Sequence, residues 1–139
     1  MISSIYISQA VGEPSEDDLF DLLEQCRRNN VKKGLSGMLM YGGGNYLQCL
    51  EGEPADVDEL LKTIDADPRH TAIKILRRVQ ITSRQFTDWS MGFEHVTEKS
   101  FADIAGLSHL GLGAYNPEYL ESNPEMIDTL LRWAARSKV

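Results

Sequence analysis

The stretch GLSGMLMYGGGNYLQCLEG, residues 34–52, decides the fold of this chain. Two apolar runs, Leu35 to Tyr41 and Tyr46 to Glu51, flank a glycine-rich connection at Gly42 to Asn45. Short apolar runs joined in this way are typical of a β-hairpin, because glycine and asparagine adopt the positive φ angles that tight hairpin turns require. The stretch therefore predicts two neighbouring antiparallel strands.

Upstream of the hairpin the pattern predicts a strand and a helix. Ser4 to Ser8 alternates polar and apolar positions, which is the period of a strand. Ser15 stands three residues before Asp18, a capping-box spacing, and apolar residues then recur with the 3.6-residue period of a helix. We expect this helix to end near Asn29 and Asn30, because asparagine favours caps and turns over a helix interior.

Downstream of the hairpin the pattern predicts a helix, two strands and a terminal helix. Pro54 suits the first turn of the second helix, which should stop at residues 65–68. Residues 90–96 form a fifth strand, and residues 125–136 form the terminal helix. A fourth strand runs to about residue 82, with four apolar residues on one parity: Ile73, Ile75, Val79 and Ile81.

The order of these elements predicts a ferredoxin-like α+β fold. A βαββαββ order gives a five-stranded mixed sheet with two helices on one face. The C-terminal helices should cover the other face. Five apolar residues of that segment are the expected contacts: Leu107, Leu110, Leu130, Leu131 and Trp133.

Composition excludes several classes of protein. The chain has 139 residues, a formal net charge of -7 and 42% hydrophobic residues, so we expect a globular domain whose acidic surface repels nucleic acid. No apolar run approaches the roughly 18 residues of a membrane helix. The N-terminus does not resemble a signal peptide, so we expect a cytoplasmic protein with no membrane partner. Cys26 and Cys49 lack metal-ligand spacing and are expected to be small buried thiols.

Three polar residues converge in this predicted topology. Tyr6 lies on the polar face of the first strand, and Gln48 interrupts the apolar third strand beside it. Asn30, at the end of the helix above the first strand, would close the same pocket. A buried glutamine amide needs partners, because an unpaired one costs about 1–3 kcal/mol, and it can meet a tyrosine hydroxyl and a planar polar ligand together. Taken singly, each residue is more often a packing, surface or helix-end residue, so the prediction depends on the three together.

Six pieces of this sequence together resemble the BLUF family of flavin-containing blue-light receptors. The pieces run in the family's order and spacing over about residues 1–96, and only their combination is specific. They are Ile5–Ser8, Arg28–Asn30, Gly34–Tyr41, Tyr46–Gly52, Asp67–His70 and Phe86–Met91.

The resemblance implies a flavin held between the two helices, FAD in the first place, with FMN and riboflavin as alternatives. Asn30 matches the asparagine that contacts the polar edge of the flavin. Gln48 matches the glutamine beside flavin N5 and O4, and Tyr6 matches the tyrosine that hydrogen-bonds this glutamine.

Five further positions follow from the same resemblance. Asn29 occupies a position that varies in the family, beside the flavin contact. Arg69 and His70 match positions near the ribityl-phosphate side of the flavin. Trp89 and Met91 match a semi-conserved pair that exchanges near the flavin, and the sequence does not decide which of them points inward.

The resemblance further implies a photoreceptor rather than an enzyme. Excited flavin is a strong oxidant with Tyr6 as a nearby electron and proton donor, and the lasting change is a rotated or tautomerised Gln48 that shifts flavin absorption to the red. Strand five and the C-terminal helices would pass the signal to a downstream signalling protein or a homo-oligomer interface. The chain then divides into a flavin-binding sensor, residues 1–96, and a helical extension, residues 97–139.

Three alternatives stay open on the residues alone. A flavin-dependent oxidoreductase would need a nicotinamide or substrate site, and no glycine-rich dinucleotide motif is present. A cofactor-free interaction module predicts a colourless protein. An acylphosphatase-like hydrolase needs an arginine on its phosphate loop, and residues 8–12 contain none.

Overall fold

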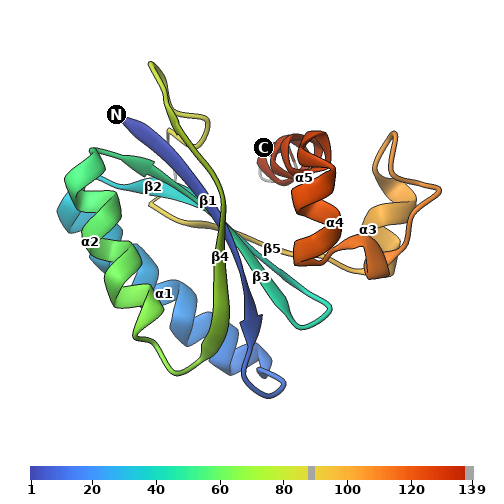
Figure 1. Ribbon diagram of the computed structural model, residues 1–139. Helices are drawn as coiled ribbons and strands as arrows, with labels where there is room; N and C mark the ends of the chain where they lie inside the picture. The colour runs from blue at the N-terminus through green and yellow to red at the C-terminus, as the bar shows by residue number, and fades with distance from the viewer. Residues whose placement is uncertain (88–89, 137–139) are drawn as a thin grey trace.

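In the computed structural model, which describes residues 1–87 and 90–136, a five-stranded sheet lies between two groups of helices (Figure 1). The strand order is β4-β1-β3-β2-β5; β5 runs parallel to β2, and the other neighbours pair antiparallel. The strands are β1 (Ile2–Ala10), β2 (Ser36–Gly42), β3 (Asn45–Gly52), β4 (His70–Gln80) and β5 (Gly92–His95). The helices are α1 (Glu16–Lys33), α2 (Pro54–Asp65), α3 (Glu98–Asp103), the 3-10 helix η1 (Leu112–Ala114), α4 (Pro117–Ser122) and α5 (Pro124–Arg136).

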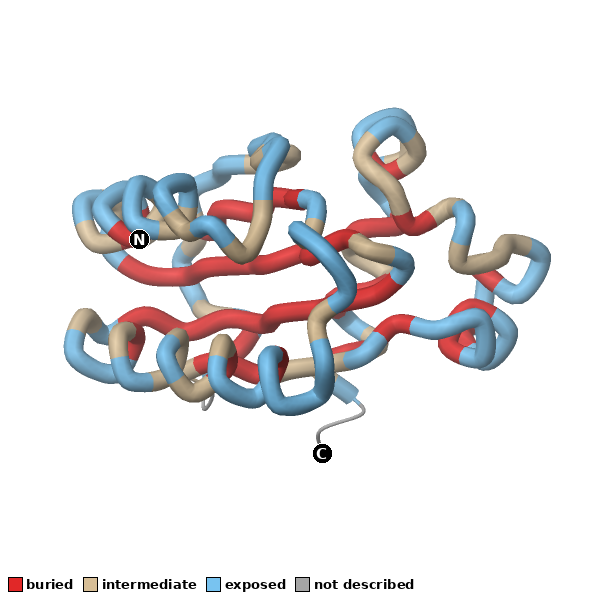
Figure 2. The backbone as a smooth tube through the Cα atoms, turned by 90° about the horizontal axis from the view of Figure 1, so that it is seen from below, coloured by how far each residue is buried: buried red, intermediate tan, exposed pale blue. Residues whose placement is uncertain are grey.

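This arrangement confirms the predicted ferredoxin-like fold, with a separate core on each face of the sheet. Figure 1 shows α1 and α2 on one side and α3, α4 and α5 on the other. In Figure 2 the buried backbone is concentrated in the strands, while the helices expose their outer sides. The helix-side core includes Leu19, Leu23, Val57 and Leu60 from α1 and α2. The C-terminal core buries Leu107, Leu130 and Leu131, and Leu110 and Trp133 pack against it, as predicted.

The hairpin that decides the fold closes in a two-residue turn. Gly43 and Gly44 have φ angles of 52° and 81°, which non-glycine residues rarely adopt. The turn sets Gly42 opposite Asn45. Two consecutive positive φ angles match the right-handed twist of the flanking strands, so the glycine pair determines where β2 and β3 meet.

The first helix begins as predicted but ends later. Ser15 caps α1 in a capping box with Asp18. The expected end near Asn29 and Asn30 is wrong, since α1 continues to Lys33 and is terminated by Gly34 in the left-handed conformation, with a φ of 65°. The backbone N–H of a glycine in this conformation donates to the last carbonyl oxygens of the helix. The glycine therefore determines where the helix ends more strongly than the two asparagines do.

The single face predicted for β4 is also wrong. The strand begins at His70, and its pairing with β1 shifts register twice, once next to Ala72, which has a φ of 55°. A β-bulge adds one residue to a strand, so the side chains beyond the bulge point to the opposite faces of the sheet from those expected. Ile75 therefore shares a side with Tyr6, whereas Val79 lies opposite Ser3 on the other side. The fifth strand is shorter than predicted, because only residues 92–95 pair with β2.

Of the helices in the described part of the chain, none is both long and apolar enough to cross a membrane. The same residues contain no group of three or more histidine, cysteine or acidic side chains that could hold a metal ion.

Candidate functional site

Tyr6 and Gln48 lie side by side on neighbouring strands. The register of β1 and β3 sets them opposite one another, and the Tyr6 hydroxyl donates a hydrogen bond to Gln48 Oε1. Only 3% of Tyr6 and 2% of Gln48 is exposed. Tyr6 belongs to the helix-side core, while its neighbours Ile5 and Ile7 belong to the C-terminal core. The structure thus brings together two predicted site residues, and their role toward a ligand remains a prediction.

Met91 extends this pair to a chain of three side chains. Gln48 Nε2 donates a hydrogen bond to Met91 Sδ at 3.5 Å, and Met91 is 2% exposed. Gly37 on β2 leaves room for it, because a Cβ at that position would lie 3.2 Å from Met91 Cε and 2.0 Å from the carbonyl oxygen of Cys49. Met91 therefore points inward, whereas Trp89, the other member of the predicted pair, lies outside the described residues.

A cavity lies beside Tyr6 and Gln48, next to α1 and the segment that joins α2 to β4. Its empty space, open solvent included, is about 340 Å³. The centre of a water molecule can occupy only about 30 Å³ of it. Apolar side chains line it together with a few polar ones. The apolar residues include Leu22, Leu39 and Ile64, and the polar residues include Tyr6, Gln48 and His70. Apolar walls with few polar groups are typical of sites for small planar ligands.

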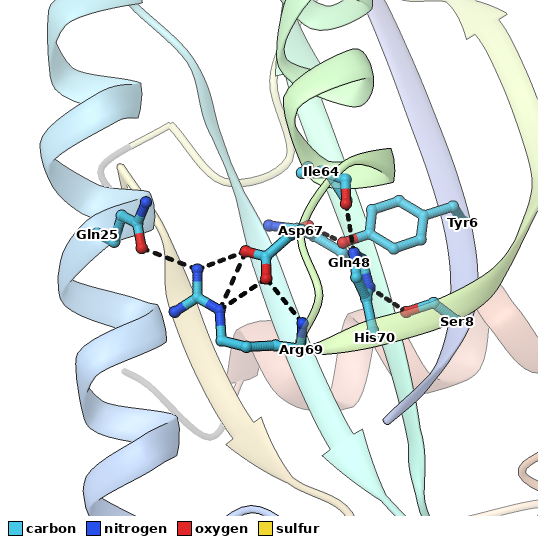
Figure 3. Close-up of polar contacts among 8 residues, drawn as sticks. All are labelled: Tyr6, Ser8, Gln25, Gln48, Ile64, Asp67, Arg69 and His70. Carbon is cyan, nitrogen blue, oxygen red and sulfur yellow. Dashed lines mark hydrogen bonds and ion pairs between the residues drawn. The ribbon is translucent and has the colours of Figure 1, made fainter. Parts of the chain in front are cut away.

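An ion pair between Asp67 and Arg69 forms part of the cavity lining (Figure 3). Arg69 Nε donates hydrogen bonds to both carboxylate oxygens of Asp67, at 2.9 and 3.0 Å. Its Nη2 reaches α1 and donates to Gln25 Oε1 at 2.8 Å. The hydrogen bonds from Arg69 hold the pKa of the Asp67 carboxyl below its usual range. Arg69, one of the predicted site residues, thus links the start of β4 to α1.

His70 forms part of the cavity wall. Its Nε2 donates to the carbonyl oxygen of Ile64 at 2.6 Å, so in the neutral ring Nδ1 accepts a hydrogen bond from the Ser8 hydroxyl at 2.7 Å (Figure 3). The ring also lies edge-on to Tyr6 and Tyr46, with centroids 6.2 Å from each. These contacts fix the imidazole next to the tyrosine of the central pair.

Asn30 is fully buried on α1 but is not one of the side chains that line the cavity. Its Nδ2 donates to the carbonyl oxygen of Ser90 at 2.6 Å, and its Oδ1 has no partner among the described residues. One turn earlier, Arg27 Nε donates to the carbonyl oxygen of Met91 at 3.0 Å. The two helix residues hold the backbone that leads into β5. Asn29 is half-buried on the same helix and is also absent from the cavity lining.

Burial keeps the hydroxyl and thiol groups of the site protonated. It raises the pKa of Tyr6 well above 10, so Tyr6 is a hydrogen-bond donor at neutral pH. It also raises the pKa of the Cys26 thiol, which lines the cavity and is only partly buried, contrary to the expectation of two buried thiols. Cys49 alone meets that expectation, and burial raises its pKa to about 12.

Sequence analysis assigned no role in the site to three residues of this region: Arg27, Glu51 and Asp67. Asp67 had a local signal, because it precedes Arg69 by two residues and accepts its backbone N–H at 2.9 Å, as Asx turns do. Arg27 contacts a residue 64 positions away, and Glu51 binds Phe86, 35 positions away. Contacts over such separations leave no local pattern.

Fold and site together define a ferredoxin-like domain built to bind a planar, polar heteroaromatic molecule. The ring system of a flavin fits these residues, since the apolar walls suit its faces and the Gln48 amide suits its polar edge. The unpartnered Asn30 Oδ1 is an acceptor suited to a ring N–H, because a buried acceptor costs free energy when it is left unpaired.

The chain belongs to the BLUF family. The family model, described as sensors of blue light using FAD, matches residues 1–92. The chain is therefore a blue-light sensor, and its cofactor is a flavin, FAD in the description of the family.

Solved structures of family members resemble the whole chain. The dark-state structure of the BLUF protein BlrB is 31% identical, covers 98% of this chain and 96% of its own, and has a TM-score of 0.77. The photo-activated state of BlsA is 30% identical, with coverage of 96% and 94% and a TM-score of 0.80. These matches include the C-terminal helices as well as the sheet.

A curated relative is much longer than this chain. The photoactivated adenylate cyclase subunit beta of Euglena longa is 35% identical over 95 residues, which are 66% of this chain and 11% of that protein. In that relative the matched domain is a small part of a light-regulated enzyme.

Proposed function

We propose that Tyr6, Gln48 and Met91 form the light-sensitive element of this sensor, with the flavin bound in the cavity beside them. The observation that supports the proposal is the unbroken chain of hydrogen bonds from the Tyr6 hydroxyl through the Gln48 amide to Met91 Sδ. When bound, the flavin supplies blue-light absorption and, once excited, a strong oxidant. Tyr6, protonated and hydrogen-bonded, is the donor of an electron and a proton in this proposal.

Four further residues would hold the flavin. Asn30 offers its unpartnered Oδ1 to the polar edge of the ring, with Asn29 as a second contact on the same helix. Arg69 and His70 border the cavity and would face the ribityl-phosphate side. A guanidinium suits a phosphate once it leaves Asp67, since its planar fork of donors matches phosphate oxygens.

The Gln48 amide can store the signal by rotating. Half a turn exchanges its oxygen and nitrogen, so that Nε2 donates to the Tyr6 oxygen and Oε1 faces Met91 Sδ. A thioether accepts hydrogen bonds but donates none, so the contact between Gln48 and Met91 is lost in the rotated state. Met91 directly precedes Gly92, the first residue of β5, and the change therefore reaches that strand. In this proposal Met91 is the neighbour of Gln48.

The C-terminal segment is the proposed output. We divide the chain into a sensor, residues 1–96, and an output extension, residues 97–139. α3 starts directly after β5 in a capping box formed by Thr97 and Ser100, so a displaced β5 moves the start of α3. The receiver would be a downstream signalling protein or a second copy of the chain; light scattering in the dark and under blue light tests the second case.

We also propose a cytoplasmic location for this sensor. Cys26 and Cys49 are both free thiols, as is usual in a reducing compartment. Cell fractionation tests this, and recovery of the protein in an oxidising compartment would contradict it.

The absorption spectrum of the purified protein, in the dark and under blue light, tests the switch. A flavin band that moves slightly to the red and relaxes in the dark supports it. Bleaching of the band would instead indicate redox turnover, and a protein that stays colourless after incubation with FAD would contradict flavin binding.

Tyr6→Phe should retain FAD but lose the light-induced red shift, because the variant has no hydroxyl to donate to Gln48. Gln48→Leu should have the same effect. The matched control is Tyr41→Phe, since Tyr41 lies in the same core and contacts Tyr46 and His95 but does not line the cavity. A normal red shift in Tyr6→Phe would refute the proposed switch.

A further inference from the structure

Glu51 is a buried carboxyl group that takes no part in the proposed light-sensitive element. It lies on β3 three residues after Gln48 and is 2% exposed. Its Oε1 accepts hydrogen bonds from the Ser36 hydroxyl at 3.1 Å and from the backbone N–H of Phe86 at 2.9 Å. Its Oε2 accepts from the backbone N–H of Gln85 at 2.7 Å. Both oxygens therefore hold the connection between β4 and β5 at its start.

A neighbouring arginine reinforces this attachment. Arg84 Nη1 donates to Ser36 Oγ at 2.9 Å and to the backbone carbonyl oxygen of Glu51 at 3.2 Å. Burying a carboxyl group is costly unless hydrogen-bond donors satisfy its oxygens, and here Ser36, Gln85 and Phe86 supply them. Phe86, which follows, is 1% exposed within the C-terminal core. Residues 84–86 are thus held by the Glu51 carboxyl group and by the packing of an aromatic ring.

β3 therefore holds the chain between β4 and β5 at two points of different strength. At residues 84–86 the holder is Glu51, and each of its two carboxyl oxygens accepts a hydrogen bond from a backbone N–H. At Met91 the holder is the Gln48 amide, which donates to sulfur at 3.5 Å and loses this bond when it rotates. The first attachment does not involve Gln48, whereas the second depends on the orientation of the Gln48 amide.

We propose that Glu51 is a positioning residue for the light signal. By fixing residues 84–86 to β3, it directs the displacement that begins at Gln48 from Met91 forward into β5, instead of backward toward β4. This inference rests on the switch described under the proposed function.

The test compares Glu51→Gln with Glu53→Gln in the full chain with FAD bound. Glu51→Gln keeps the shape of the side chain but turns one acceptor into a donor that faces the N–H of Gln85 or Phe86. Glu53 is exposed, and its side chain makes no capping hydrogen bond to α2, so the same change there is the matched control. The readouts are the flavin spectrum and amide hydrogen exchange, each in the dark and under blue light.

In the wild-type chain and in Glu53→Gln, the amides of Gln85 and Phe86 should stay protected in both states, while residues 92–95 exchange faster in the light. In Glu51→Gln the Gln85 amide should exchange about tenfold faster in the dark, as expected for one lost hydrogen bond. The red shift should persist, and the light-induced change at residues 92–95 should fall to roughly half or less if the displacement is shared with residues 84–86.

A full response of residues 92–95 in Glu51→Gln, despite faster exchange at Gln85, would overturn the inference. So would loss of the red shift in this variant with FAD bound, because Glu51 would then act on the switch itself. If the variant does not fold, the wild-type measurement decides, since light-induced loss of protection at Gln85 and Phe86 would show that this attachment is not permanent. Absence of the red shift from the wild-type chain would refute the proposed switch instead.

Discussion

Two buried tyrosines, one in each core, show how the faces of this sheet differ. Tyr115 lies in the C-terminal core at 1% exposure and donates its hydroxyl hydrogen bond to the backbone carbonyl oxygen of Met40 at 3.1 Å. Tyr6 lies in the helix-side core and donates to the side-chain amide of Gln48. A carbonyl within a paired strand cannot turn, whereas a side-chain amide can rotate and exchange donor for acceptor.

The surroundings of the two tyrosines follow the same contrast. The C-terminal core is filled by apolar side chains of β1, β2, β3 and the C-terminal helices, and Asn45 donates a hydrogen bond to the carbonyl oxygen of its Tyr115. The helix side of the sheet contains a cavity and the buried Asn30 Oδ1, which has no partner in the described part of the chain. One face therefore stabilises the domain, and the other retains the freedom that ligand binding and switching require.

The largest effect should come from the filled face. Leu130 is 0% exposed in the C-terminal core, so Leu130→Ala should lower the free energy of unfolding by about 2–5 kcal/mol, measured by urea denaturation. The red shift should be unchanged in the folded variant. Val31→Ala, at a site 68% exposed, is the control without effect. Loss of flavin binding in Leu130→Ala would show that the two faces are not independent.

Asn30→Ala should mainly affect the ligand. Removing one buried hydrogen-bonding partner of the flavin should weaken FAD binding by about fivefold to tenfold, as measured by titration of the flavin-free protein. Asn29→Ala on the same helix should have a smaller effect, because Asn29 is only half-buried. Undiminished affinity in Asn30→Ala would remove Asn30 from the site.

Alkaline titration should affect stability before it affects the switch. Burial raises the pKa values of Tyr6 and Tyr115 above 10, so the folded chain keeps these protons when the unfolded chain releases them. Their stabilising contribution is complete below about pH 10 and falls as the pH rises further. The red shift should therefore keep its size up to pH 10, measured by light-minus-dark spectra. A decline with a midpoint well below pH 10 would contradict a buried, protonated Tyr6.

The smallest effects should come from two consecutive arginines of β4 that reach opposite faces. Arg77 binds Asp128 of α5, and Arg78 binds Asp58 of α2. Surface ion pairs contribute about 0–1 kcal/mol, so each alanine variant should lose less than about 1 kcal/mol of unfolding free energy. Arg77→Ala should lose more, since 25% of the Arg77 side chain is exposed against 44% for Arg78. Equal losses that persist at high salt would point to packing instead of charge.

Much of the fold was predictable because its signals are local. The hairpin depends on Gly43 and Gly44, the start of α1 on Ser15 and Asp18, and the cover of the second face on the apolar spacing of α5. The pairing of Tyr6 with Gln48 followed from topology once strands one and three were neighbours. Each of these features is determined by residues a few positions apart or by the order of the elements.

Other features depend on contacts that no local pattern encodes. The β4 bulge, the bond from Asn30 to Ser90 and the inward position of Met91 arise where distant segments meet. The hydrogen bond from Arg69 Nη2 to Gln25 Oε1, which ties the start of β4 to α1, likewise joins residues 44 positions apart.

The sequence by itself determined the family, the order of the elements and the pairing of Tyr6 with Gln48. These features depend on hydrophobic period, turn residues and motif spacing, which can be read directly from the order of the residues. Only the tertiary structure decided that Asn30 donates a hydrogen bond to the carbonyl oxygen of Ser90, that Met91 accepts one from Gln48 and that Glu51 fixes residues 84–86. The physical reason is that a buried polar group takes whichever partner the fold brings within about 3 Å, and that partner can lie anywhere in the sequence.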